Sequence, residues 1–236
     1  MDPPPSALPA NHTNGHPHGG TAPGHDSGPV LALLARGLEL WLRQQCEAIE
    51  AVEIHLEGSA LKLLRGRLEG VRLSARGVVY QAMEMERVEL RSNGLRVRMG
   101  PLLRHQSVEL DHPFQIQGQV ALSGAGLDRS LRSPRWQALG DELASGLLGA
   151  SSLQALEIHH NQLRLTAAAP QPPGAAPAGQ SRVVEVSIGA VAGTVELHSL
   201  DGVHTLRLPM DANIQIQSAH LHNGTLNLSG QASVLP

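Results

Sequence analysis

The chain has 236 residues, of which 41% are hydrophobic and 2% aromatic, and its formal net charge is −3. This length and composition allow one large domain with a sizeable core of aliphatic side chains. The scarcity of aromatic residues argues against stacking platforms for single-stranded nucleic acid, and the net charge argues against a globally basic nucleic-acid binder. The single cysteine, Cys46, excludes an internal disulfide and a cysteine-rich metal centre.

The first 28 residues are mostly Pro, Gly, His, Ser, Thr and Asn and show no apolar periodicity, which predicts a disordered tail. The first residues lack the basic region and apolar run of a secretory signal. No stretch reaches the roughly 20 apolar residues of a membrane-spanning helix. We therefore expect a cytoplasmic protein that can associate peripherally with a membrane.

A helix is predicted to open at Gly28-Pro29, where proline suits the first helical position. Apolar residues then recur mostly at spacings of three and four: Leu31, Leu34, Leu38, Trp41, Leu42 and Ile49. We expect one helix over residues 30–50, ending near Ala51. It should pack against a sheet and bury Leu34, Leu38 and Trp41.

From Val52 onward the apolar period changes to two, which predicts strands. The alternation is clear over residues 52–57, 71–76, 95–99 and 114–122. Asn93-Gly94 supplies the residues that a tight two-residue turn needs. We therefore expect a hairpin between residues 88–91 and 95–99.

A second helical region is expected in mid-chain, around Leu127 and Leu131, followed by a helix that Ser133-Pro134 opens and Gly149 ends. Strands then return between residues 156 and 228, interrupted by a flexible loop over residues 167–181. Because the strands follow one another directly, the expected class is α+β with antiparallel sheets. Residues 29–236 should form a single domain.

The sequence holds no catalytic motif, so we expect no enzyme, no metal and no cofactor. Cys46 is interpreted as a small buried hydrophobe rather than a nucleophile. His220 and His222 share one strand face, with His198 and His204 as possible neighbours. Zinc would need three or four such ligands to converge, and a polar strand face is the interpretation that we favour.

The main physical signal is the placement of charge. Residues 60–104 contain ten basic and four acidic residues, although the whole chain is negative. On the predicted strands the basic side chains alternate with apolar ones: Arg72, Arg76, Arg96 and Arg98 against Val71, Leu73, Leu95 and Val97. Arginine binds phosphate in a bidentate manner, which suits phospholipid headgroups. A merely solvated sheet face is the alternative and, on the pattern alone, the more frequent case.

Several segments resemble the LmeA-like phospholipid-binding family, especially its cyanobacterial members. They include Leu40-Trp41-Leu42-Arg43-Gln44-Gln45, residues 64–75, Val78-Val79-Tyr80-Gln81, residues 113–122 and residues 126–134. The resemblance covers about residues 30–165. It implies a lipid-binding protein without enzymatic activity, in which a long helix is cradled by a bent antiparallel sheet, as in tubular lipid-binding domains. Because the matching motifs mark fold positions, no lipid-contact residue is implied.

Two functions are therefore considered. The first is a phospholipid-binding or membrane-peripheral protein that does not bind nucleic acid. Headgroups or an anionic membrane surface would contact Arg72, Arg76, Arg96 and Arg98, and the lipid-facing or core residues would be Trp41, Val71, Leu73, Leu95 and Val97. The second is a scaffold whose arginine-rich sheet face docks an unidentified protein. An apolar cavity between helix and sheet would favour the first, and a solidly packed core with a flat apolar patch the second.

Overall fold

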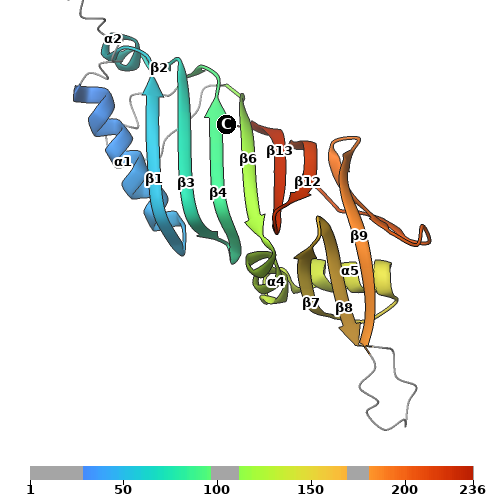
Figure 1. Cartoon of the computed structure of the whole chain (residues 1–236). Coiled ribbons are helices and arrows are strands. Elements are labelled where there is room, and N and C mark those ends of the chain that lie inside the picture. The colour runs from blue at the N-terminus through green and yellow to red at the C-terminus, as the bar shows by residue number, and fades with distance from the viewer. Residues whose placement is uncertain (1–28, 97–111, 169–180, 236) are drawn as a thin grey trace, which may run out of the picture.

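The structure, a computed structural model, describes residues 29–96, 112–168 and 181–235 (Figure 1). The first range contains α1 (Pro29–Gln45), β1 (Ala48–Glu57), α2 (Ala60–Leu64), β2 (Arg67–Leu68), β3 (Gly70–Tyr80), β4 (Met83–Ser92) and β5 (Leu95–Arg96). The second contains β6 (Phe114–Ser123), α4 (Gly124–Arg132), α5 (Gln137–Leu148), β7 (Leu153–His159) and β8 (Gln162–Ala168). The third contains β9 (Ser181–Val191), β10 (Thr194–Ser199), β11 (Thr205–Arg207), β12 (Ile214–His222) and β13 (Thr225–Val234).

The strands form antiparallel sheets. A six-stranded sheet has the order β1-β3-β4-β6-β13-β12, a five-stranded sheet has the order β11-β10-β9-β8-β7, and β2 pairs with β5. Every strand pairing among the described residues is antiparallel. The expected α+β class with antiparallel sheets is confirmed.

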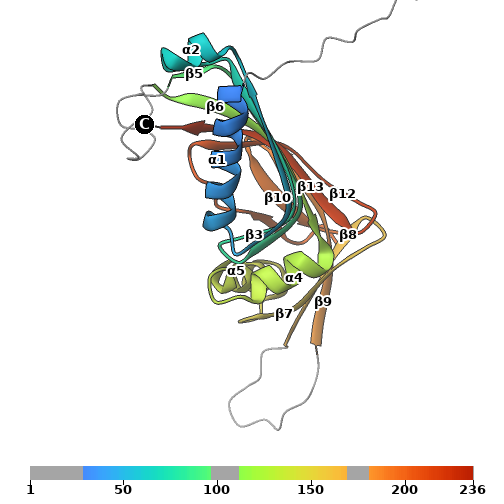
Figure 2. The same ribbon diagram turned by 90° about the vertical axis from the view of Figure 1, so that its left-hand side faces the viewer.

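The six-stranded sheet is bent, and α1 lies in its concave side (Figure 2). The period-two pattern of β3 places Val71, Leu73 and Ala75 on that inner side, while Arg72 and Arg76 are exposed on the outer side. The expected helix cradled by a bent sheet is therefore present.

The expected mid-chain helical region is also present, as α4 and α5. Ser123 caps α4 by accepting a hydrogen bond from the Gly126 amide, and Gly149 ends α5 in the left-handed region at φ 59°. Ser133 closes α4 instead of opening the next helix, which begins at Gln137. Both helices pack on the large apolar cluster shared by the two main sheets.

The first helix is shorter than the sequence predicts. It ends at Gln45, and β1 begins at Ala48. The Glu47 amide donates a hydrogen bond to the Val79 carbonyl (2.9 Å), and Ala48 pairs with Val79, so the backbone has already joined the sheet. Ile49 therefore packs from a strand rather than from the helix. Its spacing from the helical leucines fits both structures equally well, so the sequence pattern could not separate them.

The hairpin predicted at Asn93-Gly94 is wrong. β4 pairs with β3 and β6, whereas β5 pairs with β2. Neither Asn93 nor Gly94 has the positive φ that such a turn requires. The chain leaves β4 at this point, and Leu95 then packs in an apolar cluster with Leu31, Leu63 and Leu68. This packing takes precedence over the turn propensity.

Several expectations concern residues outside the described ranges. They are the tail over residues 1–28, Val97, Arg98 and most of the loop over residues 167–181. Residues 167–168 belong to β8, and Ser181 begins β9. Among the described helices, none combines the length and apolarity that crossing a membrane requires.

Candidate functional site

An apolar cavity of about 280 Å³ lies between α1 and the inner face of the six-stranded sheet. From α1 it is lined by Leu34, Leu38, Trp41 and Leu42; from the sheet by Ile54, Val71, Leu73, Leu90, Ser92, Phe114 and Ile116; and at the α2 end by Leu63, Leu68 and Leu95. Ser92 is the one polar side chain in this lining, and its hydroxyl oxygen accepts a hydrogen bond from the Val71 amide (3.1 Å). The cavity thus offers contacts for hydrocarbon.

A second cavity of about 300 Å³ continues under the C-terminal end of α1 and shares Trp41, Leu42, Leu73 and Leu90 with the first. Its other lining residues are Gln45, Cys46, Ile49, Val52, Ala75, Val78, Tyr80, Met85 and Val88. We call the two cavities together the α1 groove. Their volumes place the groove in the range of about 300–1,000 Å³ that is usual for small-molecule sites.

The helical spacing predicts that Trp41 is buried, but in the structure it is exposed. Its residue exposure is 54%, while Leu34 and Leu38 are half-buried. Trp41 projects from the edge of the helix face that meets the sheet, so its indole lines both cavities and also reaches solvent. It therefore forms part of the rim of the α1 groove rather than part of a closed core.

Four of the five predicted lipid-facing or core residues, Trp41, Val71, Leu73 and Leu95, line the groove, and the fifth, Val97, lies outside the described residues. Sequence reasoning did not single out Leu90, Phe114 or Ile116, which come from β4 and β6. Their strands carry the same alternating pattern, but only the sheet order places β4 beside β3 and β6 beside β4.

The α2 end of the groove is basic. Leu68 and Leu95 line the groove there, and their chain neighbours Arg67 and Arg96 lie opposite each other in the β2–β5 pair. Arg65, also exposed, follows α2, and Lys62 on α2 forms an ion pair with Glu69. We call Lys62, Arg65, Arg67 and Arg96 the basic end.

Arg72 and Arg76 lie on the opposite side of the sheet from the α1 groove. Their neighbours across β3 and β4 are Arg91 and Arg87, which the sequence analysis did not single out. Arg72 also forms an ion pair with Glu57. A headgroup at Arg72 or Arg76 cannot belong to a lipid in the groove, because the sheet separates the two positions.

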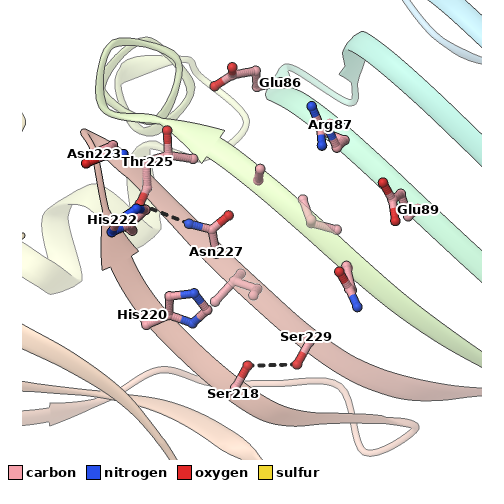
Figure 3. A pocket seen from close by; sticks show the side chains of 14 residues that line it. Glu86, Arg87, Glu89, Ser218, His220, His222, Asn223, Thr225, Asn227 and Ser229 are labelled. Atoms are coloured by element: carbon pink, nitrogen blue, oxygen red, sulfur yellow. Dashed lines mark hydrogen bonds between the residues drawn. The ribbon is translucent and has the colours of Figure 1, made fainter. Parts of the chain in front are cut away.

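A polar hollow of about 480 Å³ lies on this outer face, across β4, β6, β13 and β12. Figure 3 shows Glu86, Arg87 and Glu89 on one side of it and His220 and His222 on the other, spread along the strands rather than converging. No group of three or more His, Cys, Asp or Glu side chains in the described ranges could hold a metal ion. His198 instead contacts Glu196 (3.0 Å) and Thr205 (3.2 Å).

Cys46 is half-buried in the wall of the second cavity. Burial, and secondarily the charge of Glu47, raises the pKa of its thiol. A raised pKa keeps the group as the less nucleophilic thiol at neutral pH. The one sulfur nucleophile of the chain is thus poorly suited to attack a ligand in the groove.

The chain was compared with known proteins. The model of a family described as LmeA-like phospholipid-binding matches residues 27–231, which is most of the chain. No curated protein and no solved structure matches. The family match covers α1 and every strand that lines the α1 groove. The chain therefore belongs to the LmeA-like phospholipid-binding family.

Proposed function

We propose that this protein binds a phospholipid with its acyl chain in the α1 groove and catalyses no reaction on it. The observation that carries the proposal is the lining of the groove, which is apolar over both cavities except for Ser92 in the first and Gln45, the Cys46 thiol and the Tyr80 hydroxyl in the second. Burying hydrocarbon there is favourable by about 25 cal/mol per Å² of apolar surface removed from water.

The charge around the groove supports a phospholipid over an uncharged lipid. A phosphate at the α2 end of the groove would lie beside the β2–β5 pair, in which Arg67 precedes Leu68 and Arg96 follows Leu95. Arg67 and Arg96 point to the other face of this pair from the two leucines. Because each strand of the pair is only two residues long, their long side chains can reach around its end to a headgroup. Arginine suits this contact because its guanidinium can donate two parallel hydrogen bonds to one phosphate. Arg96, one of the four arginines predicted for headgroup contact, is therefore the one that we assign to the groove.

The absence of catalysis is part of the proposal. The groove walls are mostly apolar, and the thiol of Cys46 is held in its less reactive form. The alternative of a protein scaffold is less well supported, because the space between α1 and the sheet is a groove rather than a solidly packed core.

A blocking substitution tests this proposal. Leu73→Trp adds an indole at the junction of the two cavities, whereas Ser74→Trp adds the same group to the outer face of the same strand. After purification, extracted lipids are identified by mass spectrometry, and binding of a short-chain phosphatidylglycerol is titrated. We expect wild type and Ser74→Trp to bind lipid and Leu73→Trp to bind at least about tenfold more weakly, since it removes space that a ligand of this volume needs.

Circular dichroism and urea unfolding establish that each variant is folded. Ile116→Trp, on the β6 side of the first cavity, replaces Leu73→Trp if that variant is unfolded. The proposal is wrong if folded Leu73→Trp or Ile116→Trp binds lipid as well as wild type. It is also wrong if wild type neither carries extractable lipid nor binds the added phospholipid.

A further inference from the structure

The outward side of α1 is unusually apolar for a helix surface facing solvent. Leu33 and Leu40 are 74% and 61% exposed, and their spacing of seven residues places them on one helix face. This face is opposite the one that packs on the sheet through Leu31, Leu38 and Leu42. We call Leu33, Leu40 and the flanking Arg36 and Arg43 the outward α1 face.

The outward α1 face and the basic end adjoin each other. Leu31 of α1 and Leu63 of α2 belong to the same apolar cluster, so the N-terminal end of α1 lies near α2. Both views show α2 at that end of α1 (Figures 1 and 2). On α2, Leu61 is 60% exposed next to Lys62. Exposed leucines and basic side chains thus occur together on two neighbouring helices.

The charge of this surface differs from that of the rest of the molecule. The outward α1 face, the basic end and their neighbours Glu39 and Glu69 together hold six basic and two acidic residues, in a chain whose formal net charge is −3. Both acids lie in ion pairs within this set, with Arg43 and Lys62. By contrast, the outer face of β1, β3 and β4 intermingles four arginines with four glutamates: Arg72, Arg76, Arg87 and Arg91 with Glu53, Glu57, Glu86 and Glu89.

We propose that the outward α1 face and the basic end dock on a bilayer containing anionic phospholipid, with Leu33, Leu40 and Leu61 inserted among the headgroups. This inference rests on the proposed function and names the surface through which the groove would meet its lipid. Apolar side chains with flanking cations are the combination that places a helix in a membrane interface. The α1 groove lies directly behind this surface, with Trp41 at its rim, so a docked molecule holds the groove next to the lipid.

Vesicle flotation with the full chain tests the proposal. The vesicles are phosphatidylcholine, with or without phosphatidylglycerol. Leu33→Ser with Leu40→Ser removes the insertion. Its matched control, Val183→Ser with Val191→Ser, removes exposed apolar side chains from β9 in the other sheet. We expect the leucine variant to bind anionic vesicles about tenfold or more weakly, because each leucine withdrawn from water contributes more than 1 kcal/mol, and the valine variant to bind as wild type does.

A second pair of variants compares the two basic surfaces. Arg36→Gln with Arg65→Gln removes two charges from the proposed docking surface, and Arg72→Gln with Arg76→Gln removes two from the outer sheet face. We expect the first to weaken binding at low salt roughly thirtyfold, at about 1 kcal/mol for each charge. The second should change it much less. Raising the salt concentration should reduce the difference, because the Debye length falls to about 3 Å at 1 M.

Either of two results overturns the docking surface: unchanged binding by the leucine variant, or equal loss in the two arginine pairs. Sedimentation of the free protein separates a third outcome. A wild-type dimer that Leu33→Ser with Leu40→Ser dissociates, without vesicle binding, would make this face an interface between two copies and would also overturn the proposal.

Titration with monomeric short-chain phosphatidylglycerol keeps the two proposals distinguishable. Leu33 and Leu40 are absent from the lining of the α1 groove, so their variant should bind this ligand as wild type does. Loss of vesicle binding with retained ligand binding supports the docking surface. Failure of wild type to bind the ligand contradicts the proposed function, whatever the vesicles show.

Discussion

Trp41 shows what a helical pattern can and cannot predict. Its spacing correctly places it near the helix face that meets the sheet, but it does not say how far the sheet extends beneath it. With Leu42 it lines both cavities while more than half of its residue surface stays exposed. An amphipathic aromatic ring in this position suits a boundary between hydrocarbon and water.

Cys46 gives a natural reporter of the α1 groove, because it lies in the wall of the second cavity and is the one cysteine of the chain. Its raised pKa means that alkylation by iodoacetamide should be slow at neutral pH and should accelerate with rising pH above the usual thiol range, about 8.5. Bound short-chain phosphatidylglycerol should slow the reaction further by covering the thiol.

The alkylation rate is measured by mass spectrometry at several pH values, with and without the ligand. Unfolded protein in urea gives the rate of the unprotected thiol and is the control for direct effects of lipid on the reagent. A ligand that binds with measurable affinity but leaves the folded-state rate unchanged would contradict an acyl chain in the second cavity.

At the level of elements, α4 connects the two main sheets. Arg129 donates to the carboxylate of Glu84 on β4, and the Ser130 hydroxyl accepts a hydrogen bond from the Glu84 amide (2.9 Å). Asp128 accepts one from the amide of Leu156 on β7 (2.9 Å). Three successive residues of one short helix thus tie the start of β4, in the six-stranded sheet, to β7 of the five-stranded sheet.

The Glu84–Arg129 pair should make stability depend on pH. The hydrogen bond from Arg129 holds the pKa of Glu84 below its ordinary value. A carboxyl whose pKa is lower in the folded state stabilises the fold above its unfolded-state pKa, and this stabilisation is lost as pH falls through the folded-state value. Glu84→Gln should therefore lower the free energy of unfolding at neutral pH, and the difference from wild type should shrink below about pH 4.

Ser130→Ala is the matched variant for this measurement. Ser130 is 1% exposed, and its hydroxyl also donates to the Gly126 carbonyl (2.7 Å). Its loss should cost about 1–3 kcal/mol, because the Glu84 amide is left without that partner. Since no ionisation is involved, the cost should be independent of pH. Urea unfolding from neutral to acidic pH measures both variants, and a Glu84→Gln difference that stays constant in acid would contradict the assignment.

Turns explain much of the difference between expectation and structure. The β3–β4 hairpin turns at Gln81 and Ala82, both at positive φ without a glycine, so turn propensity could not identify it. Trp136 supports this turn by donating from its indole nitrogen to the Gln81 carbonyl (2.8 Å). Conversely, Asn93-Gly94 has the residue types that favour a hairpin turn but forms no hairpin, because the packing of Leu95 determines the path of the chain.

Across the whole molecule, the apolar side chains are unevenly distributed. One cluster of eighteen buried residues joins α4, α5 and both main sheets, whereas the two clusters around α1 have four buried residues each. Of the α1 side chains that the structure describes, Leu31 alone is buried. α1 is therefore held by fewer buried contacts than α4, α5 and the strands of the large cluster.

This uneven packing also limits what the sequence could say about the site. Period-two alternation correctly separates Val71 and Leu73 from Arg72 and Arg76, so the two faces of β3 were predictable. That α1 leaves a groove over Leu73 depends on the bend of the sheet and on the non-local order β1-β3-β4-β6. No local pattern encodes either feature, and the basic end arises from residues that meet through the equally non-local β2–β5 pair.

Lipid binding should therefore slow hydrogen exchange most strongly in α1. Elements with few buried contacts open at lower free energy than the global unfolding of the molecule. A ligand that contacts Leu34, Leu38 and Leu42 from the groove binds the state in which α1 is packed on the sheet and not the state in which α1 has opened. At a free concentration about a hundredfold above Kd, it should raise the free energy of opening by about 2.7 kcal/mol, so α1 amides should exchange about a hundredfold more slowly.

Exchange mass spectrometry at short labelling times, with and without short-chain phosphatidylglycerol, measures this effect. Peptides from α5 and β8, in the large cluster, should show little exchange under both conditions and serve as the internal reference. Leu73→Trp, with the groove blocked, should show no ligand effect in α1. Equal slowing in wild type and Leu73→Trp, or no slowing in α1 at saturating ligand, would show that the lipid does not lie between this helix and the sheet.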